Sequence, residues 1–316
     1  MRVDVYLPLL ISLLLGLVAA PLARWLPPST AGRALVAAAL VSAISTAYAL
    51  ALLTWTLLAQ IRLVAWLGGW SLQSWDDADP VPTPVALGAA LALGVAAIRL
   101  TRTIFRHRRA MAEVRRVADE LDGGPGDLVV IDEVRPEAFA LPARRGGRVV
   151  VSTGMLNALS PDERHVLLAH ENAHLAHRHH LCRALADAAA AVNPLLYRLP
   201  RAVGYATERW ADEEAASAVG DRALAARALA RAALATLAAS SSPAAPAMGY
   251  HSSDVPERVR SLLSPRPRRR PVLVAVLAAL AVLTLWAPLN ANQDAESLLV
   301  HSGAPIFLLC APHCPA

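Results

Sequence analysis

Residues 35–59 form a long apolar run without a single charged side chain. A helix of about 20 apolar residues is long enough to cross the hydrocarbon core of a bilayer, so this run predicts a membrane-spanning helix. Three further apolar runs, at residues 5–22, 81–100 and 272–289, predict the same. The mean hydropathy of +0.41 agrees with a chain that lies largely in a membrane.

The basic residues are all Arg, because the chain contains no Lys, and this usage is typical of a high-GC bacterial genome. They gather beside the apolar runs, where orientation signals belong, so the pI of about 9.6 does not indicate direct binding of nucleic acid. Arg clusters flank the region between the third and fourth runs, whereas Asp76, Asp77 and Asp79 lie between the second and third. The positive-inside rule therefore predicts a cell-membrane protein with that region in the cytoplasm and both termini outside.

This reading divides the chain into four parts. Residues 1–100 hold three spans, 101–270 form a cytoplasmic domain, 271–289 form the fourth span, and 290–316 form a short extracytoplasmic tail. The tail contains Cys310 and Cys314, and the sequence leaves open whether they form a disulfide or, with His313, a metal pair.

The cytoplasmic part predicts a mixed α+β domain in an otherwise mainly α membrane protein. A basic helix is expected from about 103 to 121, followed by strands at 128–131 and 148–152 with a turn at 144–147. The apolar stretch 181–199 either dips into the membrane surface or packs on the preceding helix, and we expect the second. An Ala-rich helix is predicted from 211 to 239.

Residues 170–174 spell His-Glu-Asn-Ala-His. Positions four apart lie on one face of a helix, so His170 and His174 can bind one metal ion, and Glu171 is placed to contact a water molecule there. This spacing is typical of a zinc peptidase. Ser160 and Glu163 have the spacing of a capping box, which predicts that a helix begins just before the motif.

A catalytic zinc site needs a third protein ligand. Glu208 is the best candidate, and Asp212, four residues later, could accept a hydrogen bond from the other ring nitrogen of a ligand His. A solvated acidic turn is the alternative, because Glu213 and Glu214 follow at once. The nearby residues His177, His179 and His180 are expected to form a solvated or interfacial face, and a role as metal ligands is the alternative.

The combination of His-Glu-x-x-His with Glu-x-x-Ala-Asp resembles the membrane zinc peptidases called gluzincins. Two branches are similar, the beta-lactam-receptor/antirepressor (BlaR/MecR-like) family and the HtpX-like and CAAX-prenyl-protease family. The resemblance covers about residues 129–263; the sequence Asn-Pro-Leu-Leu-Tyr at 193–197 resembles the first branch, and 256–262 resembles both. The chain departs from the beta-lactam sensors in having only a short tail where they carry a penicillin-binding domain.

The resemblance implies a gluzincin-type protease domain with one Zn²⁺ per chain. It implies a protein substrate at or near the bilayer, either a winged-helix repressor or the chain itself; the alternative is HtpX-like quality control of membrane proteins. A catalytically silent signalling scaffold is a third reading, against which the intact Glu171 argues. His251 and Arg258 are the candidates for an oxyanion or substrate contact. The strand at 149–151 is either an edge strand that pairs with substrate or a buried strand.

Overall fold

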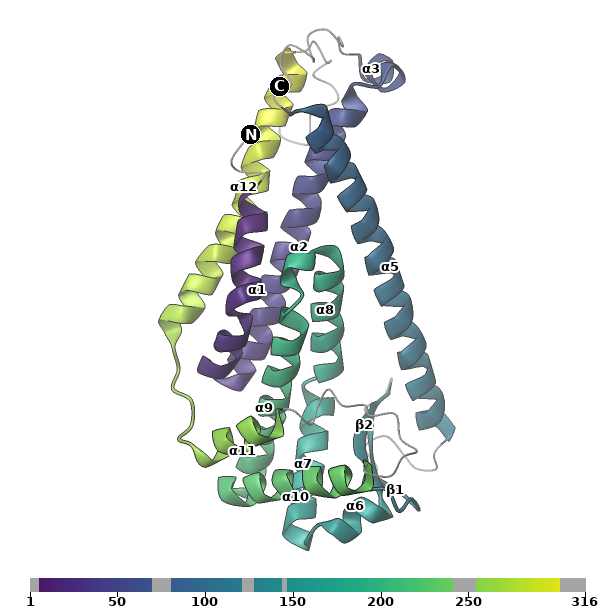
Figure 1. Cartoon of the computed structure of the whole chain (residues 1–316), viewed down its shortest axis with the longest axis vertical. Coiled ribbons are helices and arrows are strands. Elements are labelled where there is room, and N and C mark those ends of the chain that lie inside the picture. The colour runs from purple at the N-terminus through teal and green to yellow at the C-terminus, as the bar shows by residue number, and fades with distance from the viewer. Residues whose placement is uncertain (1–5, 70–80, 121–127, 144–146, 241–253, 302–316) are drawn as a thin grey trace, which may run out of the picture.

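The computed structural model describes residues 6–69, 81–120, 128–143, 147–240 and 254–301. The molecule is elongated (Figure 1). Its upper part consists of the helices α1 (Leu7–Trp25), α2 (Pro28–Ala59), α5 (Thr83–Glu120) and α12 (Pro271–His301), with the short α3 (Arg62–Gly68) after α2. Its lower part holds a small sheet and the remaining helices.

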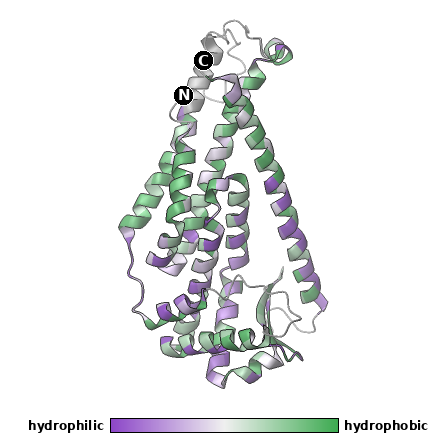
Figure 2. Ribbon diagram, in the orientation of Figure 1, coloured by the Kyte–Doolittle hydropathy of each residue, from purple (hydrophilic) through white to green (hydrophobic). Residues whose placement is uncertain are grey.

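Four helices in the described residues are long and apolar enough to cross a membrane, and each overlaps one of the predicted apolar runs. Figure 2 shows that they are hydrophobic over most of their shared length. The helices predicted at 81–100 and at about 103–121 form one continuous helix, because α5 runs through the Arg-rich stretch to Glu120. No Gly or Pro lies between Leu100 and Glu120, so nothing in the local sequence ends the helix there.

Three strands form the sheet, β1 (Leu128–Ile131), β2 (Ala138–Pro142) and β3 (Gly147–Ser152), in the order β1-β3-β2. Strand β3 pairs in parallel with β1 and antiparallel with β2. It is therefore the central strand and is largely buried, which agrees with the second of the two alternatives, a buried strand, and excludes the edge strand. The edge strand that packs beside α7 is β2. The predicted turn lies largely outside the described residues.

Helices follow the sheet: α6 (Thr153–Ala158), α7 (Pro161–Ala176), α8 (His179–Val192), the 3-10 helix η1 (Pro194–Leu196), α9 (Leu199–Val219), α10 (Arg222–Ser240) and α11 (Val255–Leu263). The single helix predicted at 211–239 is divided between α9 and α10. Gly220 ends α9 with a φ of 72°, a left-handed conformation that Gly adopts without strain.

Helices α8 and α9 form a hairpin that rises between α2 and α5 (Figure 1). The turn of the hairpin contacts the apolar helices directly: Asn193 Nδ2 donates to Thr46 Oγ1 of α2 at 2.9 Å. A Cβ on Gly16 of α1 would lie only 2.2 Å from the carbonyl oxygen of Leu195. Stretch 181–199 therefore packs among the apolar helices, and the expectation that it packs mainly on the preceding helix is wrong.

One apolar core joins α1, α2, α8, α9 and α12. A buried Arg also joins α9 to α1: Arg209 of α9 donates from Nη1 to the carbonyl oxygens of Ala23 and Arg24, at the end of α1, at 3.0 and 3.1 Å. The helix that carries Glu208 is thus held against the first membrane helix.

Candidate metal centre

The sequence of α7 explains why the motif is helical. The side chain of Ser160 accepts a hydrogen bond from the backbone N–H of Glu163, and the Glu163 carboxylate accepts one from the backbone of Ser160, which completes the predicted capping box. His170 and His174 then project from the same face, with their Nε2 atoms 3.1 Å apart.

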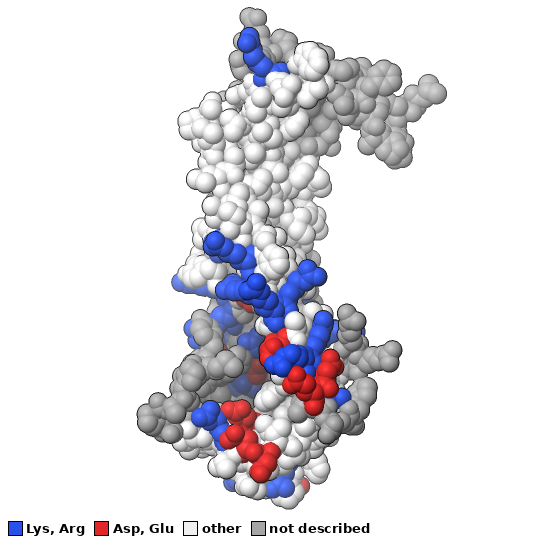
Figure 3. All heavy atoms as spheres, turned by 90° about the vertical axis from the view of Figure 1, so that its right-hand side faces the viewer, with Lys and Arg blue, Asp and Glu red and all other residues white. Residues whose placement is uncertain are grey.

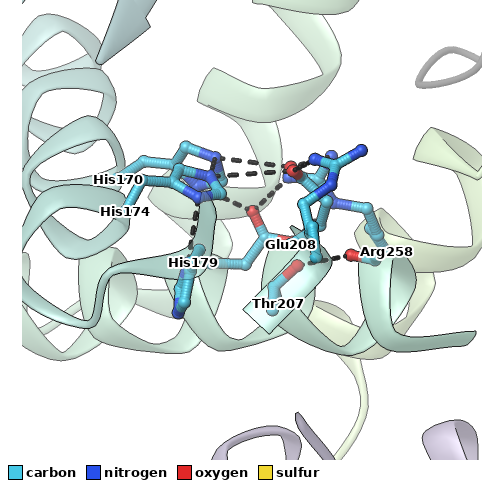
Figure 4. A network of polar contacts seen from close by, with 9 residues as sticks. His170, His174, His179, Thr207, Glu208 and Arg258 are labelled. Carbon is cyan, nitrogen blue, oxygen red and sulfur yellow. Dashed lines mark hydrogen bonds and ion pairs between the residues drawn. The ribbon is translucent and has the colours of Figure 1, made fainter. Parts of the chain in front are cut away.

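Glu208 approaches the two imidazoles from α9, which packs against α7 (Figure 4). Its carboxylate oxygens lie 3.7 Å from the Nε2 atoms of both His170 and His174. Ligands held about 2.0–2.1 Å from a tetrahedral zinc lie roughly 3.3 Å from one another, so the three side chains fit a zinc ion with little adjustment. The structure thus brings together the three residues that the sequence indicates as ligands.

Asp212 and Arg258 lie behind the ligands. Asp212 Oδ1 is 3.1 Å from His170 Nδ1, the contact that would hold the imidazole with Nε2 toward a metal. Arg258 donates from Nε and Nη2 to the two oxygens of Asp212, both at 2.7 Å, and its Nη1 lies 3.1 Å from Glu208. The guanidinium therefore contacts carboxylates, while His251, the other candidate for substrate contact, lies outside the described residues.

The charges of the site follow from these contacts. Burial raises the pKa of Glu208, but Arg258 and the two imidazoles outweigh it and hold that pKa well below its usual value. Burial alone would lower the pKa of His170; the carboxylates of Asp212 and Glu208 prevail and raise it to about 10. Glu208 is therefore ionised at neutral pH, the form in which a carboxylate binds a metal ion.

Glu171 is placed differently. Its carboxyl group lies beside the edge strand β2, where the backbone N–H of Ala140 lowers its pKa, but burial is the larger effect and raises it. A carboxylate with a raised pKa is a better proton acceptor near neutral pH than an ordinary Glu. The side chain is thus suited to accept and return a proton beside the His-His-Glu cluster.

His179 is a site residue that the sequence did not indicate. It is only 1% exposed, so the expectation of a solvated His face is wrong at this position. Its Nδ1 lies 2.9 Å from Nδ1 of His174, as Figure 4 shows. Burial, followed by the neighbouring His174, lowers the pKa of His179 to about 3, so the ring is neutral and can accept a hydrogen bond from His174.

Trp210 connects this side of the site to the membrane helices. Its ring stacks on His177, with centroids 4.3 Å apart, and packs against His179 at 5.0 Å. On α2, the guanidinium carbon of Arg33 lies 4.7 Å from the centroid of the same ring. The surroundings of the second His ligand are therefore built partly by a membrane helix.

A cavity of about 270 Å³ lies beside the cluster and is lined by Glu208, Arg258, Tyr205 and Tyr197, among others. It is large enough to hold a substrate side chain next to Glu208. The arrangement consists of a His-His-Glu cluster that could hold a metal ion, an adjacent proton acceptor and a cavity that reaches Glu208, which are components of hydrolysis at a metal ion.

The sequence profile of the family "Peptidase family M48" matches residues 106–266, just over half of the chain. "Protease HtpX homolog 1" of Saccharolobus solfataricus is 44% identical over 66 residues, which cover 21% of this chain and 21% of that protein. The chain thus aligns with only about a fifth of the length of this curated relative. No solved structure matches. With its apolar helices and its His-His-Glu cluster, the chain belongs to peptidase family M48.

Proposed function

We propose that this chain is an integral membrane zinc endopeptidase that cleaves proteins at the cytoplasmic surface of the membrane. The observation that carries the proposal is the spacing of His170, His174 and Glu208, whose ligand atoms lie within 4.8 Å of one another, with Glu171 beside them. The Arg-rich half of α5 and the Arg residues before α12 support a cytoplasmic position for this site.

A zinc ion held by the three ligands would polarise the scissile carbonyl and lower the pKa of a water molecule. Glu171 takes the proton of that water and returns it to the leaving amine. Asp212 keeps the His170 ring in the tautomer that presents Nε2. Strand β2 has no strand partner on its Glu171 side in the described residues, so an extended substrate can add to this edge.

The substrate class that we propose first is damaged or misfolded membrane protein, as in HtpX-like quality control. The similarity to an HtpX homologue supports it, because 44% identity over 66 residues is a closer likeness than the motif alone provides. Cleavage of a transcriptional repressor is the second candidate. The Asn-Pro-Leu-Leu-Tyr turn at 193–197, which resembles the antirepressor branch, is the observation in its favour.

The test of the activity is Glu171→Gln in the full-length purified protein. We expect proteolysis of an unfolded substrate such as denatured casein to fall by at least about 100-fold, the usual contribution of a general base, with zinc still bound stoichiometrically. Glu214→Gln, on the neighbouring helix but without a contact to the triad, should keep both properties. Loss of zinc from Glu171→Gln would show that Glu171 is a ligand and overturn the assignment.

The substrate class is tested by comparing cleaved proteins in cells that carry the wild type or Glu171→Gln. Quality control predicts that many membrane proteins accumulate uncleaved in the variant. A regulatory role predicts a single uncleaved DNA-binding protein instead. Accumulation of one repressor, with membrane proteins unchanged, would contradict the first candidate.

A further inference from the structure

A second cavity, of about 1070 Å³, lies between α5 and α8, on the membrane side of the metal centre. Four arginines of α5 line it: Arg99, Arg102, Arg106 and Arg109. Figure 3 shows Arg side chains gathered in a band directly below the uncharged stretch of the membrane helices. The cavity is therefore placed where the hydrocarbon core of a bilayer would give way to its polar surface.

The positive charge of this cavity is not balanced by the protein. Asp187 is its only acidic lining residue, and its carboxylate contacts His107 at 3.1 Å. Arg99 donates to the carbonyl oxygen of Ala190 and Arg106 to the hydroxyl of Thr103. Within the described residues, none of the four arginines forms an ion pair with a carboxylate. An excess of guanidinium groups around a cavity favours an anionic ligand.

The same region also offers apolar surface. Val95 and Ile98, one turn before the arginines, are exposed, and so is Phe105, which lines the cavity itself. Side chains of this kind suit the acyl chains of a lipid and not a small soluble anion. Guanidinium groups pair with phosphate oxygens in a bidentate geometry, so a ligand with a phosphate and a hydrophobic tail satisfies both surfaces.

We propose that the cavity between α5 and α8 binds the phosphate group of an anionic phospholipid. Topology alone does not account for these arginines, because an orientation signal needs positive charge near a span but needs no cavity. The cavity also shares Asp187 and Tyr197 with the one beside Glu208. A bound headgroup would thus form part of the wall next to the metal centre, and the lipid would influence access to it.

The helix itself provides a matched comparison. Arg102 and Arg109 line the cavity, are exposed and lie seven residues apart. Arg108 and Arg115 are also exposed and seven residues apart on α5, but neither lines the cavity. The pairs Arg102→Gln with Arg109→Gln and Arg108→Gln with Arg115→Gln remove the same charge from the same helix. Both pairs lie within the distance from the span over which positive charge sets orientation, so the orientation signal should respond similarly to both.

The experiment uses the full-length protein in nanodiscs of phosphatidylcholine with increasing phosphatidylglycerol, and native mass spectrometry counts the retained lipid. We expect the wild type and the 108/115 pair to retain phosphatidylglycerol over phosphatidylcholine. The 102/109 pair should bind it roughly 10- to 30-fold more weakly. Zinc content and thermal unfolding check that each variant is folded; if the 102/109 pair is not, the single changes Arg102→Gln and Arg108→Gln make the same comparison.

A second arm adds inorganic phosphate to the protein in neutral detergent. Failure of millimolar phosphate to displace phosphatidylglycerol supports a lipid ligand. Stabilisation by phosphate alone, without retained phosphatidylglycerol, would mean that the cavity takes a free anion and would overturn the proposal. Equal loss of lipid in the two charge-matched pairs would also overturn it.

Discussion

Glu208 and Asp212 are four residues apart on α9, but their contacts predict different losses. Glu208 faces both imidazoles, so Glu208→Gln removes a charged ligand and should abolish stoichiometric zinc binding together with activity. Among the three ligands Asp212 contacts only His170, at Nδ1, so Asp212→Asn should weaken zinc binding by roughly 10- to 100-fold. Zinc titration against a competing chelator measures both; full zinc retention by Glu208→Gln would place the third ligand elsewhere.

His179 should act on the metal through His174. With Nε2 of His174 on a metal, its Nδ1 carries the hydrogen, and Nδ1 of His179 is positioned to accept it. We expect His179→Leu to weaken zinc binding by about 10- to 100-fold, while His179→Asn, which keeps an acceptor, restores part of the loss. The neighbouring His180→Leu is the control and should bind zinc normally. Equal binding by His179→Leu and the wild type would limit His179 to a packing role.

Local spacing explains which site residues could be predicted. His170, Glu171 and His174 lie within one helical turn or so, where periodicity determines which side chains meet. The prediction of Glu208 as a ligand required the additional assumption that Glu208 and Asp212 face the His-Glu-x-x-His motif. His179 could not be found in this way, because the chain turns at Arg178, whose φ of 50° is a left-handed conformation that Arg rarely adopts. That turn brings the first residue of α8 back onto His174.

At the scale of an element, α7 depends on its first turn. Burial raises the pKa of Glu163, but hydrogen bonds from Ser160 and the charge of Arg231 prevail and lower it below the usual 4.5. A group whose pKa is lower in the folded state stabilises the protein above its unfolded pKa, and this contribution is lost as the pH falls through the folded value. The capping box is therefore stabilising at neutral pH and weakens in acid.

The corresponding variant is Glu163→Ala. We expect it to cost about 1 kcal/mol at pH 7, as the loss of a cap does, and to differ less from the wild type below about pH 4. Thermal unfolding in detergent at several pH values measures the difference. Asp162→Ala, an exposed acidic change in the same turn, should have a smaller effect. If the stability difference between Glu163→Ala and the wild type were the same at pH 7 and below pH 4, the charge of Glu163 would not contribute to stability.

Element boundaries were less predictable than the elements themselves. The apolar runs gave the four long helices because hydrophobic length is a local property. The continuation of α5 into its Arg-rich half was missed because a change in polarity is not a helix-breaking signal. The central position of β3 depends on a parallel pairing with β1, which is a tertiary contact and leaves no mark in the strand itself. Gly220 lies inside the predicted helix 211–239, and because Gly commonly ends helices, the division into α9 and α10 could have been predicted from the sequence.

At the scale of the whole molecule, the orientation in the membrane stays a prediction. Arg residues lie on both sides of the metal-binding region in the sequence, so we expect that region in the cytoplasm and both termini outside. A phosphatase reporter fused after Ala316 should be active only outside the cytoplasm, and a cytoplasmic-type reporter fused near Ser242 should be active inside. The reverse pattern would exclude a cytoplasmic substrate. The division at residues 100, 270 and 289 also stays a prediction.

The single apolar core that the membrane helices share with the α8–α9 hairpin could not be predicted from the sequence. The apolar residues of stretch 181–199 predict that it is buried, but they do not indicate which helices it packs against. Gly16, which has no side chain where Leu195 approaches, is the residue most sensitive to this contact. We expect Gly16→Leu to lower the unfolding temperature and the zinc content together, whereas Gly94→Leu, with open space around its Cβ, should change neither.

The hydrogen bonds from Arg209 to the end of α1 have a consequence for how the enzyme is made. At 5–20 residues per second, α1 and α2 leave the ribosome roughly 10 to 30 seconds before α9. Glu208, next to Arg209, lies on a helix that packs on α1 and α2 as well as on α7. We therefore expect zinc loading to follow membrane insertion. In a chain that fails to insert, Glu208 would not be in position beside His170 and His174. We expect such a chain to lack proteolytic activity outside the membrane.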